Sequence, residues 1–293
     1  MTAASAGGPV TVIGASGRSG AALCRALLAQ GILVIPVVRD AARWRALGLA
    51  GAPRLADLRD HGAVAAALAG AARVVSCVHA RWAPAVLAAL PPGADIVLMG
   101  STRRYSRWPE ALGDGVRAGE AAFLAAGRPG VMLHASMIYG AEGEDNVQRL
   151  AALLRRLPVA PLPGGGRALV QPIHQDNVTA CLLAALERRW TAPRVIVVAG
   201  PEPLPYRDFL GAVARAAGIA PPPVVPVPAV LLRLLAPLTR VLPRLLRIDA
   251  DEVRRLTEDK AFDIAPMRAE LGIDPMPLEQ GLRLTFAAVP SAH

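Results

Sequence analysis

Residues 9–20 read PVTVIGASGRSG, and this stretch decides the fold. A short apolar run leads directly into a turn whose glycines are spaced GxxGxxG, and a helical pattern follows. Glycine lets the chain turn sharply and lets its backbone approach a pyrophosphate, while the amides at the start of the helix would face the phosphates. The order of strand, turn and helix therefore predicts a dinucleotide site, against the alternative of a turn that binds nothing. The predicted cofactor contacts in this stretch are Gly14, Ser16, Gly17, Arg18, Ser19 and Gly20.

Further apolar, β-branched runs recur along the first half of the chain, with alanine-rich segments between them. The predicted strands are residues 10–13, 32–38, 73–78, 95–99 and 131–133. The predicted helices are residues 21–30, 61–69, 83–90 and 115–126. Alternating strands and helices predict an α/β fold with a doubly wound parallel sheet. Because the strands are continuously apolar, helices are expected to cover both faces of the sheet.

The length of 293 residues and the apolar share of 53% provide for a sizeable core and argue against disorder. We expect a Rossmann dinucleotide-binding core over residues 1–160. Residues 161–293 would add the remaining sheet elements and a small C-terminal substrate lobe, interleaved with the core in one folding unit. No apolar run reaches about 18 residues without a charge, so no membrane-spanning helix is expected. The N-terminal MTAASAGG also lacks the basic start of a secretory signal.

The net charge of +9 at pH 7 raises the question of nucleic-acid binding. Lysine occurs once and arginine supplies all other basic side chains, which is typical of a genome-wide composition bias. Aromatic residues make up only 4%, and no basic cluster is interleaved with them, so nucleic acid is not an expected partner. The cysteines, Cys24, Cys77 and Cys181, are scattered and odd in number. This argues against a disulfide framework or a metal site and favours a reducing cytoplasm.

The second predicted strand ends with PVVRD, where NAD enzymes usually carry a carboxylate for the ribose 2′-hydroxyl. The position is Arg39, with Asp40 one residue beyond. A guanidinium here would pair with a 2′-phosphate through charge-assisted contacts, and Arg18 would add a second positive charge. We therefore expect NADP rather than NAD. The alternative is that Arg39 is a solvated surface residue and that Asp40 binds the hydroxyl.

The GASGRSG turn resembles the extended and atypical branches of the short-chain dehydrogenase/reductase superfamily, the NAD(P)-dependent epimerase/dehydratase-like proteins. Later motifs extend this resemblance over most of the chain, as far as RLTEDKAFDIAPMRAELGIDPMPLEQGL at residues 255–282. The resemblance implies that Asp57 and Leu58, in LADLRD, contact the adenine. It also implies that Val78 and His79, in VVSCVHA, lie beneath the ribose and nicotinamide.

Most members of that superfamily use a tyrosine and a lysine spaced YxxxK on one helix face. In this chain other residue types stand four positions after each tyrosine: Pro109 after Tyr105, Gly143 after Tyr139 and Leu210 after Tyr206. The single lysine, Lys260, is far away in sequence. Aligning Glu120 with a glutamate common in the family puts Val116 at the lysine position and Leu112 at the tyrosine position. Neither side chain transfers a proton, so the ordinary catalytic pair is expected to be absent.

Polar side chains remain near the expected nicotinamide, in GSTRRYSR at residues 100–107. The resemblance places Ser101 and Thr102 where the family's serine or threonine bonds the substrate. If the chain is an enzyme, we expect Ser101 to orient the substrate and Tyr105 to donate the proton. The alternative is a polar loop with an arginine-rich face.

Four other titratable residues are expected to have structural roles. His79 and His134 lie at or near strand ends, where a lone histidine is more often a hydrogen-bonded packing residue than a proton carrier. Glu120 is expected to be a solvated helix residue rather than a catalytic base. Asp176 is expected to cap a helix over residues 178–188.

Two motifs in the second half resemble the family's substrate-binding region. SMIYGAEGEDN, residues 136–146, looks like the segment after the sixth strand, and PLPGGGRALVQPIHQDNV, residues 161–178, like the glycine-rich hairpin before a helix. The implied substrate contacts are Thr102, Tyr139, Asn146 and His174. Val170 stands where sugar-nucleotide epimerases commonly carry a diphosphate-binding arginine, which argues against a sugar-nucleotide substrate.

Residues 228–247, PAVLLRLLAPLTRVLPRLLR, predict a helix with a basic stripe on an otherwise apolar surface. Arg233, Arg240, Arg244 and Arg247 fall within an arc of roughly 60° when a helix turns by about 100° per residue. Such a stripe is typical of peripheral contact with an anionic membrane, here the inner membrane face. The alternative is a lid helix packed on the substrate lobe, and an apolar or lipid-linked substrate would suit either interpretation.

Two functions follow from these observations. The first is an NAD(P)-dependent oxidoreductase or epimerase/dehydratase-like enzyme that acts on a small or lipid-linked carbonyl or hydroxyl substrate, because the cofactor itself carries the hydride chemistry. The second is a catalytically silent NADP(H)-binding sensor, regulator or assembly protein. The substrate-lobe motifs favour the enzyme and the missing tyrosine–lysine pair favours the sensor. Between them, we expect the enzyme.

Overall fold

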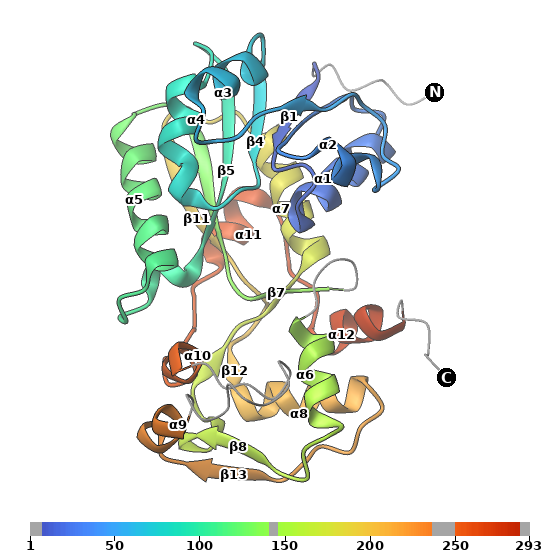
Figure 1. Cartoon of the computed structure of the whole chain (residues 1–293), viewed down its shortest axis with the longest axis vertical. Helices are drawn as coiled ribbons and strands as arrows, with labels where there is room; N and C mark the ends of the chain where they lie inside the picture. The colour runs from blue at the N-terminus through green and yellow to red at the C-terminus, as the bar shows by residue number, and fades with distance from the viewer. Residues whose placement is uncertain (1–7, 141–145, 236–249, 288–293) are drawn as a thin grey trace.

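The computed structural model describes residues 8–140, 146–235 and 250–287. Its centre is a seven-stranded sheet in the order β11-β6-β5-β4-β1-β2-β3, with parallel pairing throughout (Figure 1). The strands are β1 (Val10–Ile13), β2 (Val34–Val38), β3 (Arg54–Leu55), β4 (Arg73–Ser76), β5 (Asp95–Ser101), β6 (Gly130–Ala135) and β11 (Pro193–Val198). The predicted doubly wound α/β fold is confirmed. The edge strand β11 comes from the second half of the chain, which the alternating pattern of the first half did not include.

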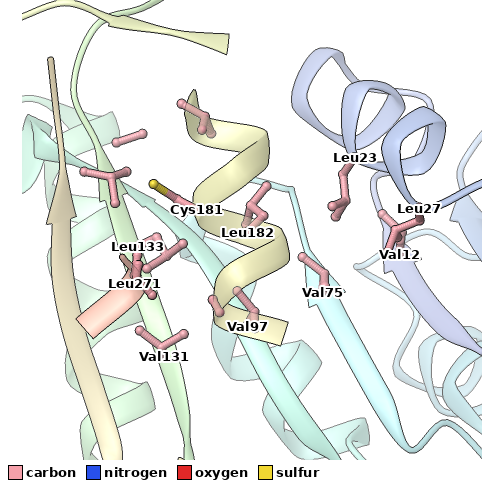
Figure 2. Close-up of a cluster of buried hydrophobic side chains, with 14 of the residues drawn as sticks. Val12, Leu23, Leu27, Val75, Val97, Val131, Leu133, Cys181, Leu182 and Leu271 are labelled. Atoms are coloured by element: carbon pink, nitrogen blue, oxygen red, sulfur yellow. The ribbon is translucent and has the colours of Figure 1, made fainter. Parts of the chain in front are cut away.

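Helices cover both faces of this sheet, as its continuously apolar strands predict. One face packs against α1 (Arg18–Ala29), α7 (Gln175–Glu187) and α11 (Ala265–Leu271), and the other against α3 (His61–Leu68), α4 (Ala83–Ala89) and α5 (Ala111–Ala125). Figure 2 shows the first of these two cores. Along β5, Val97 belongs to the first core, while Ile96 and Leu98 belong to the second. Successive side chains of a strand point to opposite faces, so both cores draw on the same apolar run.

Short polar or ring side chains set where several helices begin. Asp40 caps α2 (Ala41–Arg45) and Asp60 caps α3, each accepting a hydrogen bond from an amide of the first turn. The start of α7 differs from the prediction. His174 is its N-cap, and the Nδ1 atom of His174 accepts a hydrogen bond of 3.2 Å from the Asp176 amide. The expected capping role of Asp176 is therefore wrong, because that residue lies exposed in the first turn of α7.

The second half of the chain completes the sheet and also builds a smaller lobe next to it (Figure 1). α7, β11 and α11 return to the sheet, so the two halves of the chain are interleaved. The lobe pairs β7 (Ile138–Tyr139) with β10 (Ile173–His174), β8 (Ala160–Pro163) with β13 (Val224–Val227), and β9 (Leu169–Val170) with β12 (Leu204–Pro205). Its helices are α6 (Asn146–Leu154), α8 (Tyr206–Ala216), α9 (Ala229–Leu235), α10 (Ala250–Arg255) and α12 (Leu278–Ala287).

Only part of the predicted amphipathic segment, residues 228–247, falls among the described residues. Its last three arginines lie outside them. The described part forms α9, on which Val230 and Leu234 are 64% and 69% exposed. In the portions of the chain that the structure describes, no helix has the length and apolar character needed to cross a membrane.

Candidate functional site

The glycine turn follows β1 and opens α1, as predicted. Gly14 has a φ of +77°, a conformation that favours glycine, and its carbonyl oxygen accepts a hydrogen bond of 2.9 Å from the Gly17 amide. A Cβ atom on Gly20 would overlap the same carbonyl oxygen. The first turn of α1 can therefore pack this closely against the end of β1 only with glycine at position 20. The amides that begin α1 are thereby placed to face a pyrophosphate.

A cavity of about 1020 Å³ lies between this edge of the sheet and the lobe. Eight predicted site residues line it: Arg18, Ser19, Val78, His79, Ser101, Thr102, Tyr105 and Asn146. The other predicted site residues lie outside its lining: Gly14, Ser16, Gly17, Gly20, Arg39, Asp57, Leu58, Tyr139 and His174. One space thus joins the start of α1 to the loop after β5, at the carboxyl ends of the strands. Open α/β sheets bind their ligands in this position.

Three of the predicted cofactor contacts lie after β2 and β3, beyond the cavity lining. Arg39 is exposed directly after β2, and the neighbouring Asp40 uses its carboxylate to cap α2. Asp57 is exposed, and its carboxylate accepts a hydrogen bond of 3.0 Å from the Arg59 amide. Leu58 packs against the core beside α3. These positions border the sheet edge predicted for the adenosine half of the cofactor, and the contacts themselves stay predictions.

Ser19 and His79 border the cavity from the cofactor side. Ser19 is buried, and its hydroxyl donates a hydrogen bond of 3.0 Å to the Oε1 atom of Gln175, which ties α1 to α7. The Nδ1 atom of His79 accepts a hydrogen bond of 3.1 Å from the Arg81 amide. Partial burial, and then the positive charges of Arg81 and Arg103, lower the pKa of His79. The ring is therefore neutral at neutral pH.

Ser101 ends β5, and Tyr105 ends the short 3-10 turn that follows. The Ser101 hydroxyl accepts a hydrogen bond of 3.3 Å from the amide two residues later. The Tyr105 ring stands edge-on to His134 with ring centroids 6.1 Å apart, and the Arg104 guanidinium lies 4.9 Å from its centroid. Partial burial raises the pKa of Tyr105, and the positive charge of Arg104 opposes that rise. The phenol is therefore protonated at neutral pH and can act as a proton donor.

A buried network lies behind the Tyr105 ring. Glu120, on α5, is 5% exposed; its Oε2 atom lies 2.6 Å from the Nε2 atom of His134 and also pairs with Arg104. Burial alone would raise the pKa of Glu120, but the hydrogen bonds from Arg104 and His134 hold it below its ordinary value. Burial lowers the pKa of His134. The expectation of a solvated Glu120 is therefore wrong, whereas His134 is a hydrogen-bonded packing residue as expected.

The face of α5 that resembles the catalytic helix of the family contributes apolar groups. Val116 lines the cavity, and Leu112, one turn earlier, is 40% exposed. A basic side chain reaches the same cavity from another segment. Lys260 lines it from the residues that follow α10. Sequence spacing could not reveal this, because only the fold brings the C-terminal segment to the carboxyl end of β5.

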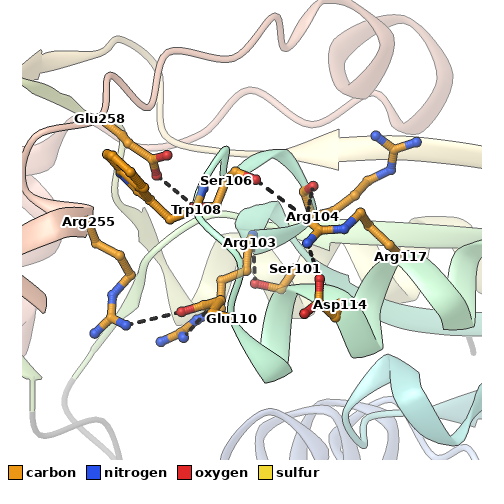
Figure 3. A network of polar contacts seen from close by, with 10 residues as sticks. All are labelled: Ser101, Arg103, Arg104, Ser106, Trp108, Glu110, Asp114, Arg117, Arg255 and Glu258. Carbon is orange, nitrogen blue, oxygen red and sulfur yellow. Dashed lines mark hydrogen bonds and ion pairs between the residues drawn. The ribbon is translucent and has the colours of Figure 1, made fainter. Parts of the chain in front are cut away.

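The loop after β5 is fixed to α5 and to the C-terminal segment by ion pairs and hydrogen bonds (Figure 3). Glu110 accepts a hydrogen bond of 2.9 Å from Arg103 and one of 3.2 Å from Arg255. The buried Glu258 accepts hydrogen bonds of 2.9 Å from the Ser106 hydroxyl and from the next amide. This network forms one wall of the cavity, and the acidic and basic residues in it were missed from the sequence. Their only sequence signal is the density of arginines in GSTRRYSR.

Tyr139 and His174, predicted to touch the substrate, lie in the core beside α12. Tyr139 is 1% exposed, and its hydroxyl donates a hydrogen bond of 3.4 Å to the Leu278 carbonyl oxygen. The His174 ring is edge-on to Tyr139, with ring centroids 5.2 Å apart. Neither ring is in the lining of the cavity, and Tyr139 joins β7 to α12 instead. Asn146 does line the cavity, and its Nδ2 atom donates a hydrogen bond of 2.6 Å to the Ile138 carbonyl oxygen.

The cysteines offer no thiolate at this site. Burial raises the pKa of Cys24 and of Cys181 to about 12, and it raises the pKa of Cys77, which lines the cavity, beyond that. Within the described ranges, no three histidine, cysteine, aspartate or glutamate side chains gather as a metal ion would require. The polar groups that line the cavity are therefore hydroxyls, amides, arginines, one lysine, His79 and the carboxylates of Glu258 and Asp259.

A family model described as NAD(P)H-binding matches residues 14–104, from the glycine turn to the loop after β5. Three uncharacterized proteins, two of Mycobacterium tuberculosis and one of Mycobacterium bovis, are 28% identical to the chain over 237 residues. The alignment covers 76% of this chain, and the chain spans only 24% of the length of these relatives.

The sheet and the lobe together share the fold of several solved proteins. UDP-glucose 4-epimerase of Thermus thermophilus, in complex with NAD, has a TM-score of 0.70 at 20% identity, covering 97% of this chain and 100% of that one. The NADPH-dependent quinone oxidoreductase of Escherichia coli, complexed with NADPH, has a TM-score of 0.72 at 16% identity, covering 93% and 98%. A short-chain dehydrogenase/reductase superfamily protein from Agrobacterium tumefaciens, with bound NAD, has a TM-score of 0.68 at 16% identity, covering 96% of each chain. The extended short-chain dehydrogenase/reductase fold that the motifs predicted is thereby confirmed.

Proposed function

We propose that this chain is an NAD(P)-dependent oxidoreductase, with NADP preferred, that acts on a small or lipid-linked carbonyl or hydroxyl substrate. The observation that carries the proposal is the single cavity that runs from Arg18 and Ser19, at the start of α1, to Ser101 and Tyr105. A nicotinamide bound along this path would meet a substrate beside both hydroxyls. A volume of about 1020 Å³ lies at the upper end of ligand sites, which span about 300–1,000 Å³.

In this mechanism the cofactor, Ser101 and Tyr105 each have a separate role. The bound cofactor supplies the hydride chemistry. The Ser101 hydroxyl would orient the substrate oxygen, and Tyr105 would give it a proton, since a phenol whose pKa is raised by burial keeps its proton at neutral pH. An epimerase or dehydratase reaction would use the same cofactor site with a different substrate.

The preference for NADP is supported by the residues after β2. The Oδ1 atom of Asp40 accepts hydrogen bonds of 2.8 and 3.4 Å from two amides of α2, so this carboxylate already serves as a helix cap. Arg39 is exposed beside it. A guanidinium in this position favours a 2′-phosphate.

A second candidate function is a catalytically silent NADP(H)-binding sensor, regulator or assembly protein. The observation that favours it is the apolar character of α5 at Leu112 and Val116, where the related enzymes carry their tyrosine and lysine. Such a protein would bind the nucleotide and turn over no substrate.

Fluorescence titration of the protein with NADPH and with NADH tests the cofactor. We expect NADPH to bind more tightly, and Arg39→Ala to weaken it by about 1.5–3 kcal/mol, the usual contribution of a hydrogen bond to a charged group. Arg268→Ala, an exposed arginine on α11, is the matched control and should leave binding unchanged. Absence of binding by either nucleotide would refute the proposal.

Oxidation of NADPH in the presence of aldehydes, ketones and quinones then separates the enzyme from the sensor. Turnover that falls in Ser101→Ala and in Tyr105→Phe supports the assigned roles. Turnover that Tyr105→Phe leaves intact would reject Tyr105 as the proton donor. Tight NADPH binding with no oxidation by any of these carbonyl compounds would favour the sensor.

A further inference from the structure

The cavity holds the only lysine of the chain. Lysine occurs once in 293 residues, and it faces the cavity in a lining that also contains four arginines: Arg18, Arg103, Arg107 and Arg255. In the part of the chain that the structure describes, the acidic side chains of the lining are Glu258 and Asp259. The lining is therefore biased toward positive charge.

Lys260 is held in place from both sides. Its amide donates a hydrogen bond of 2.8 Å to the Leu169 carbonyl oxygen, and the carboxylate of Asp259 accepts one of 2.9 Å from the Leu169 amide. Two residues later, the Phe262 ring packs against Tyr105 with ring centroids 5.8 Å apart. The lysine is thus fixed relative to the lobe and to the loop that carries Tyr105.

The carboxylates near this lysine already have partners. Glu110 is shared by two guanidinium groups, those of Arg103 and Arg255. Glu258 and Asp259 already accept hydrogen bonds from backbone amides. The lysine ammonium donates to the carbonyl oxygen of Arg255, an uncharged partner. Three basic groups therefore share one part of the cavity wall.

Burial is the main influence on the pKa of Lys260, and it lowers this pKa. The negative charge of Glu258 opposes the change, the positive charges of Arg255 and Arg103 add to it, and Asp259 opposes it more weakly. The ammonium is thus less stable here than in water. A bound anion would reverse this effect, because an opposite charge at close range favours the protonated amine.

We propose that Lys260, Arg103 and Arg255 bind an anionic group of the substrate, a carboxylate or a phosphate, at the lobe side of the cavity. This rests on the proposed function in one respect only, which is that the anion belongs to the substrate of that cavity. An ammonium is a compact point charge, whereas a guanidinium offers paired donors, so the two types together can surround a carboxylate or phosphate. A carbonyl substrate bearing such a group would place its anion here and its carbonyl toward Ser101 and Tyr105.

Competitive acylation with acetic anhydride tests this site, because only one side-chain amine in the chain can react. Trypsin cuts after arginine and leaves acylated Lys260 in the peptide 256–268, which mass spectrometry follows separately from the N-terminal amine. We expect pyrophosphate and malonate, at an ionic strength matched with sodium chloride, to slow acylation of Lys260 several-fold. The N-terminal amine should react at an unchanged rate. Vesicles of phosphatidic acid, compared with phosphatidylcholine vesicles, show whether a lipid headgroup supplies the same anion.

Variants connect this protection to the two arginines. Arg103→Gln and Arg255→Gln should each weaken protection by pyrophosphate, and Arg45→Gln, an exposed arginine on α2, should not. Without an anion, the first two variants should also acylate Lys260 more slowly, because removing a neighbouring positive charge raises the pKa of the amine. If either variant fails to fold by circular dichroism, calorimetric titration of Lys260→Met with pyrophosphate replaces it, with a several-fold loss of affinity expected.

Equal acylation of Lys260 with and without every anion would overturn the proposal, as would protection that persists in both arginine variants. The NADPH titration remains a separate test. Protection of Lys260 in a protein that binds no nucleotide would leave the anion site standing and remove the oxidoreductase. Nucleotide binding without protection of Lys260 would overturn the anion site and leave the proposed oxidoreductase standing.

Discussion

At the residue scale, Tyr105 is 46% exposed and lines the cavity, and three side chains contact its ring. His134, Arg104 and Phe262 contact that ring. Glu120 forms ion pairs with Arg104 and His134. The arrangement places a positive charge against the phenol from a residue next to it in sequence. Arg104 therefore opposes the rise that burial causes in the pKa of Tyr105.

Replacing Arg104 tests this interpretation. Arg104→Met should raise the pKa of Tyr105 further above its ordinary value, because the charge that opposes the effect of burial is lost. Ultraviolet titration measures the change, and Tyr105→Phe identifies which of the tyrosine signals belongs to this ring. Arg117→Met is the matched control, since Arg117 donates to the Arg104 carbonyl oxygen rather than lying on the ring. An unchanged titration curve in Arg104→Met would show that the cation has no influence on the phenol.

The buried pair of Glu120 and His134 predicts a specific pH dependence of stability. Burial lowers the pKa of His134 below 6.5, so the unfolded chain binds a proton there more readily than the folded chain does. The contribution to the free energy of unfolding is therefore fully present above about pH 6.5 and is lost as pH falls through the folded-state pKa. His134→Gln should show a smaller loss of stability between neutral and mildly acidic pH than the wild type in urea titrations. If the free energy of unfolding falls equally with pH in His134→Gln and in the wild type, His134 is not the source of the pH dependence. The other buried histidines would then be its source.

At the element scale, the glycine turn and α1 form the part of the site that local geometry specifies. A side chain at position 20 would overlap the Gly14 carbonyl oxygen. Gly20→Ala should therefore destabilise the fold by about 1–3 kcal/mol, as overpacking usually does, and should weaken NADPH binding. Gly62→Ala, within α3 and free of such overlap, is the control and should stabilise by about 0.5–1 kcal/mol. Urea unfolding and fluorescence titration measure the two effects, and normal nucleotide binding by Gly20→Ala would contradict the tight packing of the turn.

The short helix α9 predicts contact with a membrane surface. Val230, Leu231 and Leu234 are exposed on it, and the basic residues of the predicted amphipathic segment follow in sequence. We propose that this segment binds anionic vesicles peripherally, and we expect Val230→Ser, Leu231→Ser and Leu234→Ser together to reduce co-sedimentation several-fold. Leu33→Ser, an exposed leucine before β2, is the control. Co-sedimentation that the three serines do not change would favour a lid helix.

At the scale of the whole molecule, the chain crosses between the sheet and the lobe several times. α7, β11 and α11 lie in the sheet although they come from the second half, and the lobe contacts the loop after β5 through Glu258. We therefore expect one cooperative unfolding transition rather than two. Calorimetry with circular dichroism and tryptophan fluorescence tests this, and transitions at different temperatures by the two probes would indicate separate units.

The fold and the cofactor turn were predictable because their signals are local. A continuous apolar run such as residues 95–99 is enough to predict a strand that contributes to a core on each face of the sheet. The spacing of the glycines in residues 14–20 is likewise enough to predict the backbone geometry of the turn. Asn146, which a family motif singled out, lines the cavity, and its contact with a substrate stays a prediction. The same kind of motif misled at Tyr139 and His174, because a motif specifies the segment and not the direction in which each ring is buried.

What the sequence by itself determined is therefore the doubly wound sheet and the dinucleotide turn. Each depends on residues a few positions apart, whose geometry the backbone fixes. Only the tertiary structure decided that Glu120 is buried against His134, and that Lys260 and Arg255 share a cavity with Tyr105. The physical reason is that hydrophobic patterning encodes which face of an element is buried but not which distant side chain meets it, and charged groups gain their partners only in the folded chain.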